Sequence, residues 1–150
     1  MATPKPQMTI ADLNQFFDDA FDTPRGYEVV RIEQDRLQIR QSVETLMLRP
    51  GGTVSGPTLM ALADAAAYAL ILAHIGPVAL AVTSSLTISF LRKPQPVDVV
   101  ADAEFLKLGR KLAVVDVRLR SDGMADPIAQ AVVTYALPST PPSSSPLESA

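Results

Sequence analysis

The segment from Ser55 to Ile75 constrains the fold of this chain more than any other. It reads SGPTLMALADAAAYALILAHI, and its polar side chains are too few to form a hydrophilic face. A helix that is apolar on every side is normally buried on every side, so the rest of the chain must cover this one. Asp64 at its centre is the only carboxylate between Pro50 and Leu91. Because an unpaired buried carboxylate is costly, Asp64 is either a functional group or part of a structural hydrogen-bond network.

Length and composition indicate a single globular domain. A chain of 150 residues can bury about two thirds of its unfolded surface, and its net charge of −3 does not indicate nucleic-acid binding. The sequence has no cysteine, which fits a reducing compartment such as the cytoplasm, and its N-terminus lacks the apolar core of a secretion signal. We reject a membrane span for the long helix, because a carboxylate at its centre would cost about 2.5–3.5 kcal/mol on insertion.

Hydrophobic periodicity predicts one more helix and several strands. Apolar residues at helical spacing follow Thr9 and Asp12 and predict a helix over 10–21. Residues 27–48 alternate apolar and polar side chains, which predicts strands and a hairpin turn near Gln34 and Asp35. Beyond the long helix, which Gly76-Pro77 ends, turn sequences separate four strand-like runs. These runs are Leu80–Leu91, Val99–Leu108, Leu112–Ser121 and Ile128–Leu137.

The order of these elements predicts the fold class. Strands joined by tight turns form antiparallel sheets, and a curved sheet wrapped around one long central helix would bury that helix in an α+β fold. We divide the chain into an N-terminal helical segment (1–26), the main domain (27–137) and a Pro/Ser-rich tail (138–150) with a disordered composition. Because such a sheet has unpaired edges, we expect at least a homodimer.

Several short motifs occur in the order that is typical of one protein family. The motif Leu62-Ala63-Asp64 places its acid nine residues after Ser55. The strand-like motifs ISFLRKP, LGRKL and VTY begin further along the chain, at Ile88, Leu108 and Val133. With these motifs the chain resembles the hotdog-fold acyl-CoA thioesterases, and within them the PaaI-like, 4-hydroxybenzoyl-CoA thioesterase-type branch, over about residues 49–135. The resemblance implies the hotdog fold and a homotetramer built as a dimer of dimers.

The resemblance also implies a reaction, the hydrolysis of an acyl-CoA thioester at the N-terminus of the long helix. Gly56 takes the role of the N–H that holds the thioester carbonyl, a role that suits the unpaired donors of a helix start. Asp64 takes the role of general base or nucleophile, facing the active site of a neighbouring subunit. Ser55 replaces the histidine of the family motif, and Pro57 replaces its second glycine; both are predicted to contact the substrate.

Arg49 stands where the family has an amide. Arginine cannot accept a hydrogen bond, so we expect it to pair with Asp64 or with a carboxylate of the substrate. Thr83 and Ser84, close to the start of the next strand, are predicted to hydrogen-bond the substrate, with strand-end hydrogen bonds as the alternative.

Coenzyme A carries phosphates, for which the chain offers basic residues at two turns. Arg92 and Lys93 end one strand, and Arg110 and Lys111 precede another. Arginine suits phosphate oxygens, and Arg110 is the best single candidate, although exposed charges are also ordinary at turns.

The acyl group and two alternative functions stay open. Apolar residues such as Leu59, Met60 and Tyr68 favour an aryl or medium-chain acyl group, whereas Arg49 in the pocket would favour a charged one. With one histidine and no cysteine, we expect no metal, and no cofactor apart from coenzyme A as part of the substrate. The alternatives are an acyl-CoA-binding protein without catalysis and a hotdog hydratase or dehydratase, which the scarcity of histidine disfavours.

Overall fold

A computed structural model describes residues 3–20, 26–45, 48–77 and 81–138, with only the backbone of residues 48 and 49. Two α-helices and eight strands lie in the described segments. The helices are α1 (Ile10–Ala20) and α2 (Gly56–Ile75), and a 3-10 turn covers Val43–Thr45. The strands are β1 (Tyr27–Glu33), β2 (Arg36–Gln41), β3 (Leu48–Arg49), β4 (Thr53–Val54), β5 (Val82–Phe90), β6 (Val99–Leu108), β7 (Leu112–Ser121) and β8 (Ala129–Ala136).

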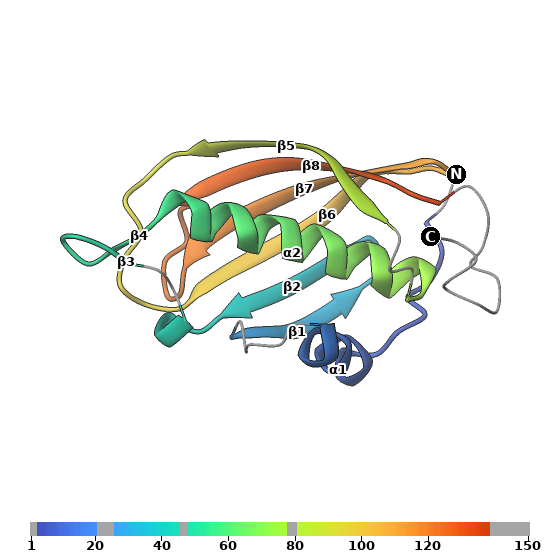
Figure 1. Ribbon diagram of the computed structural model, residues 1–150, viewed down its shortest axis with the longest axis horizontal. Helices are drawn as coiled ribbons and strands as arrows, with labels where there is room; N and C mark the ends of the chain where they lie inside the picture. The colour runs from blue at the N-terminus through green and yellow to red at the C-terminus, as the bar shows by residue number, and fades with distance from the viewer. Residues whose placement is uncertain (1–2, 21–25, 46–47, 78–80, 139–150) are drawn as a thin grey trace.

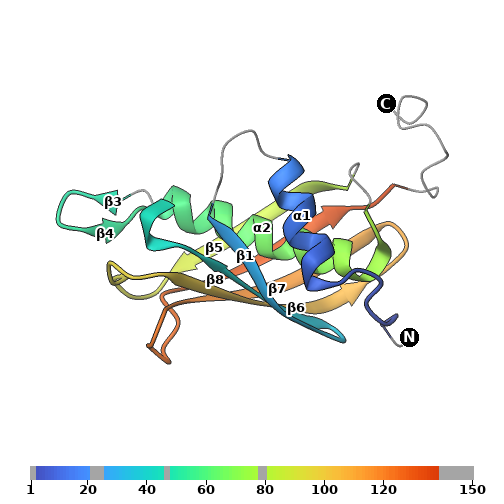
Figure 2. The same ribbon diagram turned by 90° about the horizontal axis from the view of Figure 1, so that it is seen from below.

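Six strands form one antiparallel sheet in the order β1-β2-β6-β7-β8-β5. The long helix α2 crosses one face of this sheet, with β5 and β1 at the two edges (Figure 1). Seen from below, α1 lies on the same side of the sheet as α2 (Figure 2). The predicted α+β fold, an antiparallel sheet with one long central helix, is therefore confirmed.

Burial of α2 follows from its composition. Leu62, Leu70, Ile71 and Leu72 are fully buried, and most of its alanines are buried with them. The small alanine side chains allow the inward-facing residues of the strands to approach the helix closely. Strand β8 shows the matching pattern, since its residues alternate strictly between buried and half-buried positions. By length and composition α2 could cross a membrane, but 67% of its most apolar window is buried inside the domain. Its hydrophobicity is accounted for by the core.

Two parts of the predicted hairpin region were wrong. The strand predicted to continue to residue 48 ends at Gln41, because the chain enters a 3-10 turn in which the carboxylate of Asp98 accepts the N–H of Val43. A second, two-stranded hairpin, β3–β4, was missed. Gly51 and Gly52 at its turn have φ angles of 95° and 79°, which explains the glycine pair that the sequence showed. The turn near Gln34 and Asp35 is confirmed.

The far end of α2 is attached to the sheet by the one histidine of the sequence. His74 is fully buried in the last turn, where its Nδ1 lies 2.9 Å from the carbonyl oxygen of Leu70. Its Nε2 accepts the N–H of Asp35 at 3.2 Å, at the β1–β2 turn where Asp35 has a φ of 71°. These two bonds need the neutral ring with a proton on Nδ1. His74 thus serves as a structural link and is remote from the start of the helix.

The N-terminal helix begins as predicted and adds an aromatic cluster. Thr9 N–H donates to a carboxylate oxygen of Asp12, and Asp12 N–H donates to the Thr9 hydroxyl, which caps α1. The hydrogen bonds lower the pKa of Asp12. Phe16 and Phe17 of α1 make edge contacts with the ring of Tyr68 on α2, at centroid distances of 6.0 and 6.5 Å. All but the first residue of the predicted tail lies outside the described residues.

Candidate active site

The N-terminus of α2 presents one backbone donor to the outside. Ser55 is the N-cap: its hydroxyl accepts the N–H of Thr58 at 3.4 Å, and its carbonyl accepts the N–H of Leu59. Pro57 has no N–H. In the described part of the chain nothing accepts the N–H of Gly56, which therefore remains available to a ligand at the positive end of the helix dipole. The helix begins at Gly56, so Pro57 takes its second position.

A cavity of about 570 Å³ opens beside this donor. Apolar side chains of Val54, Leu59 and Phe90 form part of its wall, and Arg92 and Lys93 stand at its rim. The ring of Phe90 lies directly against Gly56, since a Cβ added to Gly56 would come within 3.2 Å of Phe90 Cζ. The absence of a side chain at Gly56 leaves room for this ring, and the backbone φ of Gly56 is one that any residue adopts. Ser55 and Pro57 also line the cavity, and their contacts with the substrate remain a prediction.

Asp64 lies two turns further along α2, partly buried, and accepts two hydroxyl hydrogen bonds. Thr83 Oγ1 donates to Asp64 Oδ1 at 2.7 Å, and the Tyr135 hydroxyl donates to the same oxygen at 2.8 Å. The ring of Tyr68 stacks on that of Tyr135, with centroids 5.7 Å apart and planes 14° from parallel. Burial raises the pKa of the Tyr135 phenol far above its usual range, so this hydroxyl stays protonated and donating. Thr83 is thereby bonded to Asp64, where we had expected it to contact substrate.

Gly56 and Asp64 of one chain are too far apart to act on one bond. They are eight residues apart on the same helix, which at about 1.5 Å per residue separates them by about 12 Å. Groups that act on one reacting carbon must all lie within about 3.5 Å of it. The two sites within one subunit are therefore halves of different active centres, or Asp64 serves another purpose.

The predicted basic residues fall into two groups at opposite ends of the sheet. Arg92 and Lys93 follow β5 at the end near Gly56, and Arg92 donates to the carbonyl of Pro127 at 2.8 Å. Arg110 and Lys111 occupy the β6–β7 turn, which lies at the other end (Figure 1). Lys111 is next to the pairing of Leu112 with Ala136.

Four further residues named in the sequence analysis have different outcomes. Ser84 is exposed, and its hydroxyl lies 3.3 Å from the carbonyl oxygen of Thr134, a bond within the sheet. The side chain of Arg49 lies outside the described residues, and its backbone belongs to β3. Met60 and Tyr68, both cited above in favour of an apolar acyl group, are not among the residues that line the cavity, and Met60 is 40% exposed.

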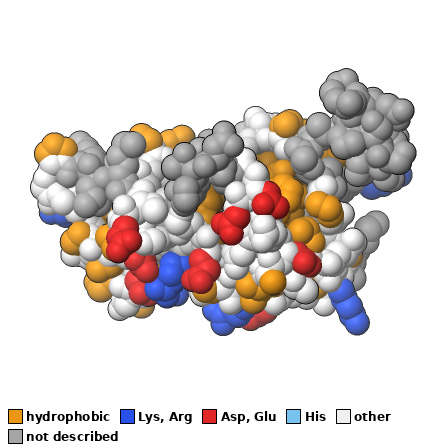
Figure 3. Space-filling view, turned by 60° about the horizontal axis from the view of Figure 1, so that its bottom comes forward, with side chains coloured by type: hydrophobic (Ala, Val, Ile, Leu, Met, Phe, Trp, Pro, Cys, Tyr) orange, Lys and Arg blue, Asp and Glu red, His pale blue; other side chains and the backbone are white. Residues whose placement is uncertain are grey.

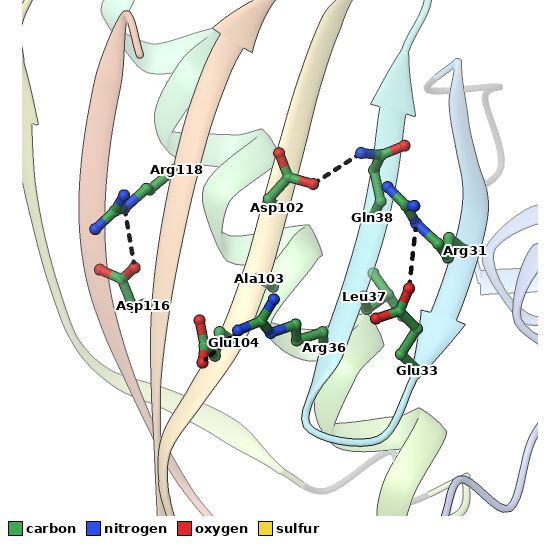
Figure 4. A pocket seen from close by; sticks show the side chains of 10 residues that line it. All are labelled: Arg31, Glu33, Arg36, Leu37, Gln38, Asp102, Ala103, Glu104, Asp116 and Arg118. Carbon is green, nitrogen blue, oxygen red and sulfur yellow. Dashed lines mark hydrogen bonds and ion pairs between the residues drawn. The ribbon is translucent and has the colours of Figure 1, made fainter. Parts of the chain in front are cut away.

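A second hollow, of about 410 Å³, lies on the face of the sheet opposite α2 (Figure 4). Its charged side chains already pair across the strands: Arg36 lies 3.4 Å from Glu104, and Gln38 donates to Asp102 at 2.8 Å. In the view of Figure 3, acidic and basic side chains are interspersed and form no large patch of one sign. This hollow contains neither Asp64 nor a helix terminus, so the candidate active site is the one at α2.

Comparison with known proteins decides the family. The family model described as the thioesterase superfamily matches residues 51–128. A protein from a Silicibacter species, assigned to the thioesterases, is 40% identical, with a TM-score of 0.84 over 91% of this chain and 96% of its own. This chain belongs to the thioesterase superfamily. The predicted resemblance is confirmed, and the protein is a hydrolase of thioesters.

More distant members of the superfamily agree. Thioesterase superfamily member 2 of zebrafish is 25% identical, with a TM-score of 0.77 over 88% of this chain and all of its own. A variant of the phenylacetic acid degradation protein PaaI of Thermus thermophilus is 26% identical, with a TM-score of 0.66 over 81% of this chain and 98% of its own. Among curated proteins, none is significantly similar to this thioesterase in sequence.

Sequence reasoning missed two residues of this site. Tyr135 was noted only within a strand motif, and Phe90 only within another. A signal for Tyr135 existed, since it is the one polar side chain at the inward-facing positions of β8. Nothing in the sequence could show that it reaches Asp64, which is 71 residues away.

Proposed function

We propose that this thioesterase hydrolyses acyl-CoA esters, with the N–H of Gly56 polarising the thioester carbonyl and Asp64 acting as general base or nucleophile. The observation that carries the proposal is the unpaired Gly56 N–H, at a helix start, opening into an apolar cavity with a basic rim. A single positioned donor of this kind contributes about 10²–10³ to the rate of acyl transfer.

The residues suffice for a balanced reaction. As general base, Asp64 takes a proton from water while the water oxygen attacks the carbonyl carbon, and Gly56 stabilises the resulting oxyanion. Collapse breaks the C–S bond, and the leaving thiolate takes the proton from the Asp64 carboxyl. As nucleophile, Asp64 attacks the carbon itself, the C–S bond breaks and an anhydride forms; water then hydrolyses the anhydride and supplies the proton that the thiolate takes up. When water attacks the anhydride at the Asp64 carbonyl carbon, one turnover in ¹⁸O-water leaves label in Asp64, which the general-base route cannot do.

The active centre is completed by a second copy of the chain. Strand β5 is an edge strand, and Thr83 and Phe90 lie near its two ends. Pairing of two β5 edges about a two-fold axis is antiparallel, so the Thr83 end of one subunit meets the Phe90 end of its partner. Asp64 then approaches the Gly56 of the partner subunit, which overcomes the separation of about 12 Å within one chain.

The same pairing unites the two basic groups. The β6–β7 turn lies at the Thr83 end of β5, since Leu112 pairs with Ala136 and Ala136 with Val82. Arg110 and Lys111 of one subunit are thereby brought toward Arg92 and Lys93 of the partner subunit. Four basic side chains at one cavity mouth suit the phosphates of coenzyme A.

The cavity favours an aryl or medium-chain acyl group. Its wall beside Gly56 consists of Val54, Leu59 and the ring of Phe90, and apolar walls gain from burying a ring or a short chain. We further propose a cytoplasmic enzyme that works as a dimer of dimers and needs no cofactor beyond the coenzyme A of its substrate.

The test is thiol release from a panel of acyl-CoAs by the wild type, Asp64→Asn and Asp64→Ala. We expect turnover by the wild type and a loss of at least about a hundredfold in both variants, with the fold and the oligomer unchanged by circular dichroism and sedimentation. A wild type that binds acyl-CoA but releases no thiol would instead identify a binding protein.

A further inference from the structure

The two hydroxyls that reach Asp64 bind one and the same oxygen. Thr83 Oγ1 and the Tyr135 hydroxyl both donate to Oδ1, at 2.7 and 2.8 Å. A carboxylate oxygen has two lone pairs, so two donors occupy Oδ1 fully. In the part of the chain that the structure describes, no donor reaches Oδ2. The carboxylate is held by one oxygen and open at the other.

Strand register places the two donors side by side. Thr83 of β5 is the direct cross-strand partner of Tyr135 of β8. Tyr135 belongs to the buried, inward-facing set of β8, so its partner faces α2 as well. Neither hydroxyl is delivered by a loop. Both stand on strands within the sheet, which is the arrangement that holds a functional group most accurately.

A β-bulge is what turns Thr83 inward. Leu86 and Ile88 of β5 pair with the buried residues Val133 and Ala131, so even-numbered positions face inward there. The register shifts between Thr83 and Ser85, and this extra residue moves the inward-facing position from an even to an odd number. Without the bulge, Thr83 would face away from Asp64. Bulges of this kind re-aim side chains beside active sites.

Tyr135 has the properties of a fixed donor. It is 3% exposed, and the ring of Tyr68 stacks on it. Among the described residues, Tyr68 itself makes no hydrogen bond through its hydroxyl. The two tyrosines are thus stacked rings of equal size, of which one donates to Asp64 and the other does not.

We propose that Tyr135 and Thr83 are positioning residues that hold Asp64 by Oδ1 and direct Oδ2 at the water or the thioester. This inference rests on the proposed function, in which Asp64 does the chemistry. It assigns Oδ2 of Asp64 as the reacting atom, and it explains the bulge of β5 as the feature that orients Thr83. Loss of either hydroxyl lets the carboxylate rotate, so it lowers kcat and leaves substrate binding largely intact.

Steady-state kinetics of Tyr135→Phe test the inference, with Tyr68→Phe as the matched control and Asp64→Asn in the same assay. A hydrogen bond to a charged group corresponds to about 10- to 100-fold in rate. We expect kcat to fall by about that factor in Tyr135→Phe while KM changes less than about threefold. Tyr68→Phe removes a hydroxyl from the adjacent ring and should retain the wild-type kcat.

Substitutions of Thr83 give a second test, which does not require changing a buried core residue. It lies on an exposed edge strand. Thr83→Ala should lower kcat and Thr83→Ser should restore it, because serine keeps the hydroxyl. A purely structural bond would lower thermal stability without this split between kcat and KM.

The possible failures are distinguishable. If the wild type is inactive, or if Asp64→Asn is as active as the wild type, the proposed function and this inference both fall. If the wild type is active and Asp64→Asn is not, yet Tyr135→Phe and Thr83→Ala keep the wild-type kcat, only the positioning role is refuted.

Discussion

Gly56→Ala separates the chemistry at the helix start from the stability of the helix. The backbone of Gly56 has an ordinary φ, so alanine causes no backbone strain there; it gains less than the roughly 0.5–1 kcal/mol of a mid-helix position, because Gly56 is the first residue of α2. Against this gain, the new Cβ would lie 3.2 Å from Phe90 Cζ, closer than an ordinary contact. Phe90 is 53% exposed and can shift by a few tenths of an ångström. The two effects nearly cancel, and we expect the midpoint of thermal unfolding to change by less than about 4 °C.

The effect on catalysis should be far larger. The added methyl group meets the ring of Phe90 in the wall of the cavity beside the Gly56 N–H, and the thioester carbonyl must approach that nitrogen to within about 3 Å. Loss of one such donor costs about 2.7–4 kcal/mol in the transition state, or about 10²–10³ in rate. We therefore expect kcat/KM, measured by thiol release from the best acyl-CoA, to fall by about 10²-fold.

A double variant tests the reasoning. If the methyl group acts only by displacing the ring, Gly56→Ala/Phe90→Ala should recover the activity of Phe90→Ala alone. If it blocks the carbonyl itself, the double variant stays inactive. Activity of Gly56→Ala within about threefold of the wild type, in a protein that unfolds normally, would show that this N–H is not the oxyanion donor.

Three other substitutions probe the fold, the interface and the binding of coenzyme A. His74→Ala leaves the N–H of Asp35 without its acceptor and opens a cavity, so the free energy of unfolding in denaturant should fall by about 3 kcal/mol. Thr87→Asp places two like charges, one from each subunit, near the proposed two-fold axis of β5. Sedimentation should then show monomers, and thioesterase activity should be lost with the dimer. The control Val30→Asp, on the β1 edge, should leave the dimer intact. Arg92→Ala should raise KM about tenfold for an acyl-CoA and leave KM unchanged for an acyl-pantetheine without the nucleotide; equal effects on both substrates would place Arg92 outside the phosphate site.

The order and class of the elements could be predicted from the sequence. An apolar helix of 20 residues with few polar side chains can only be a core helix in a soluble fold, and the alternating runs after it can only be strands that cover it. The single acid within that helix identified Asp64 as a candidate for the same energetic reason. These inferences hold because burial is a property of local composition and period.

The partners of those residues could not be predicted, because they depend on tertiary register. The bonds from Tyr135 and Thr83 to Asp64 join residues far apart in the chain. They meet at one oxygen because β8 lies next to β5 and a bulge in β5 turns Thr83 to the same side as Tyr135. The contact of Phe90 with Gly56, and the separation of the basic residues to opposite ends of the sheet, arise in the same way. Sequence determines which groups must be buried, whereas the packing of the sheet on the helix decides which of them meet, since a shift of one residue in a strand turns every side chain to the other face.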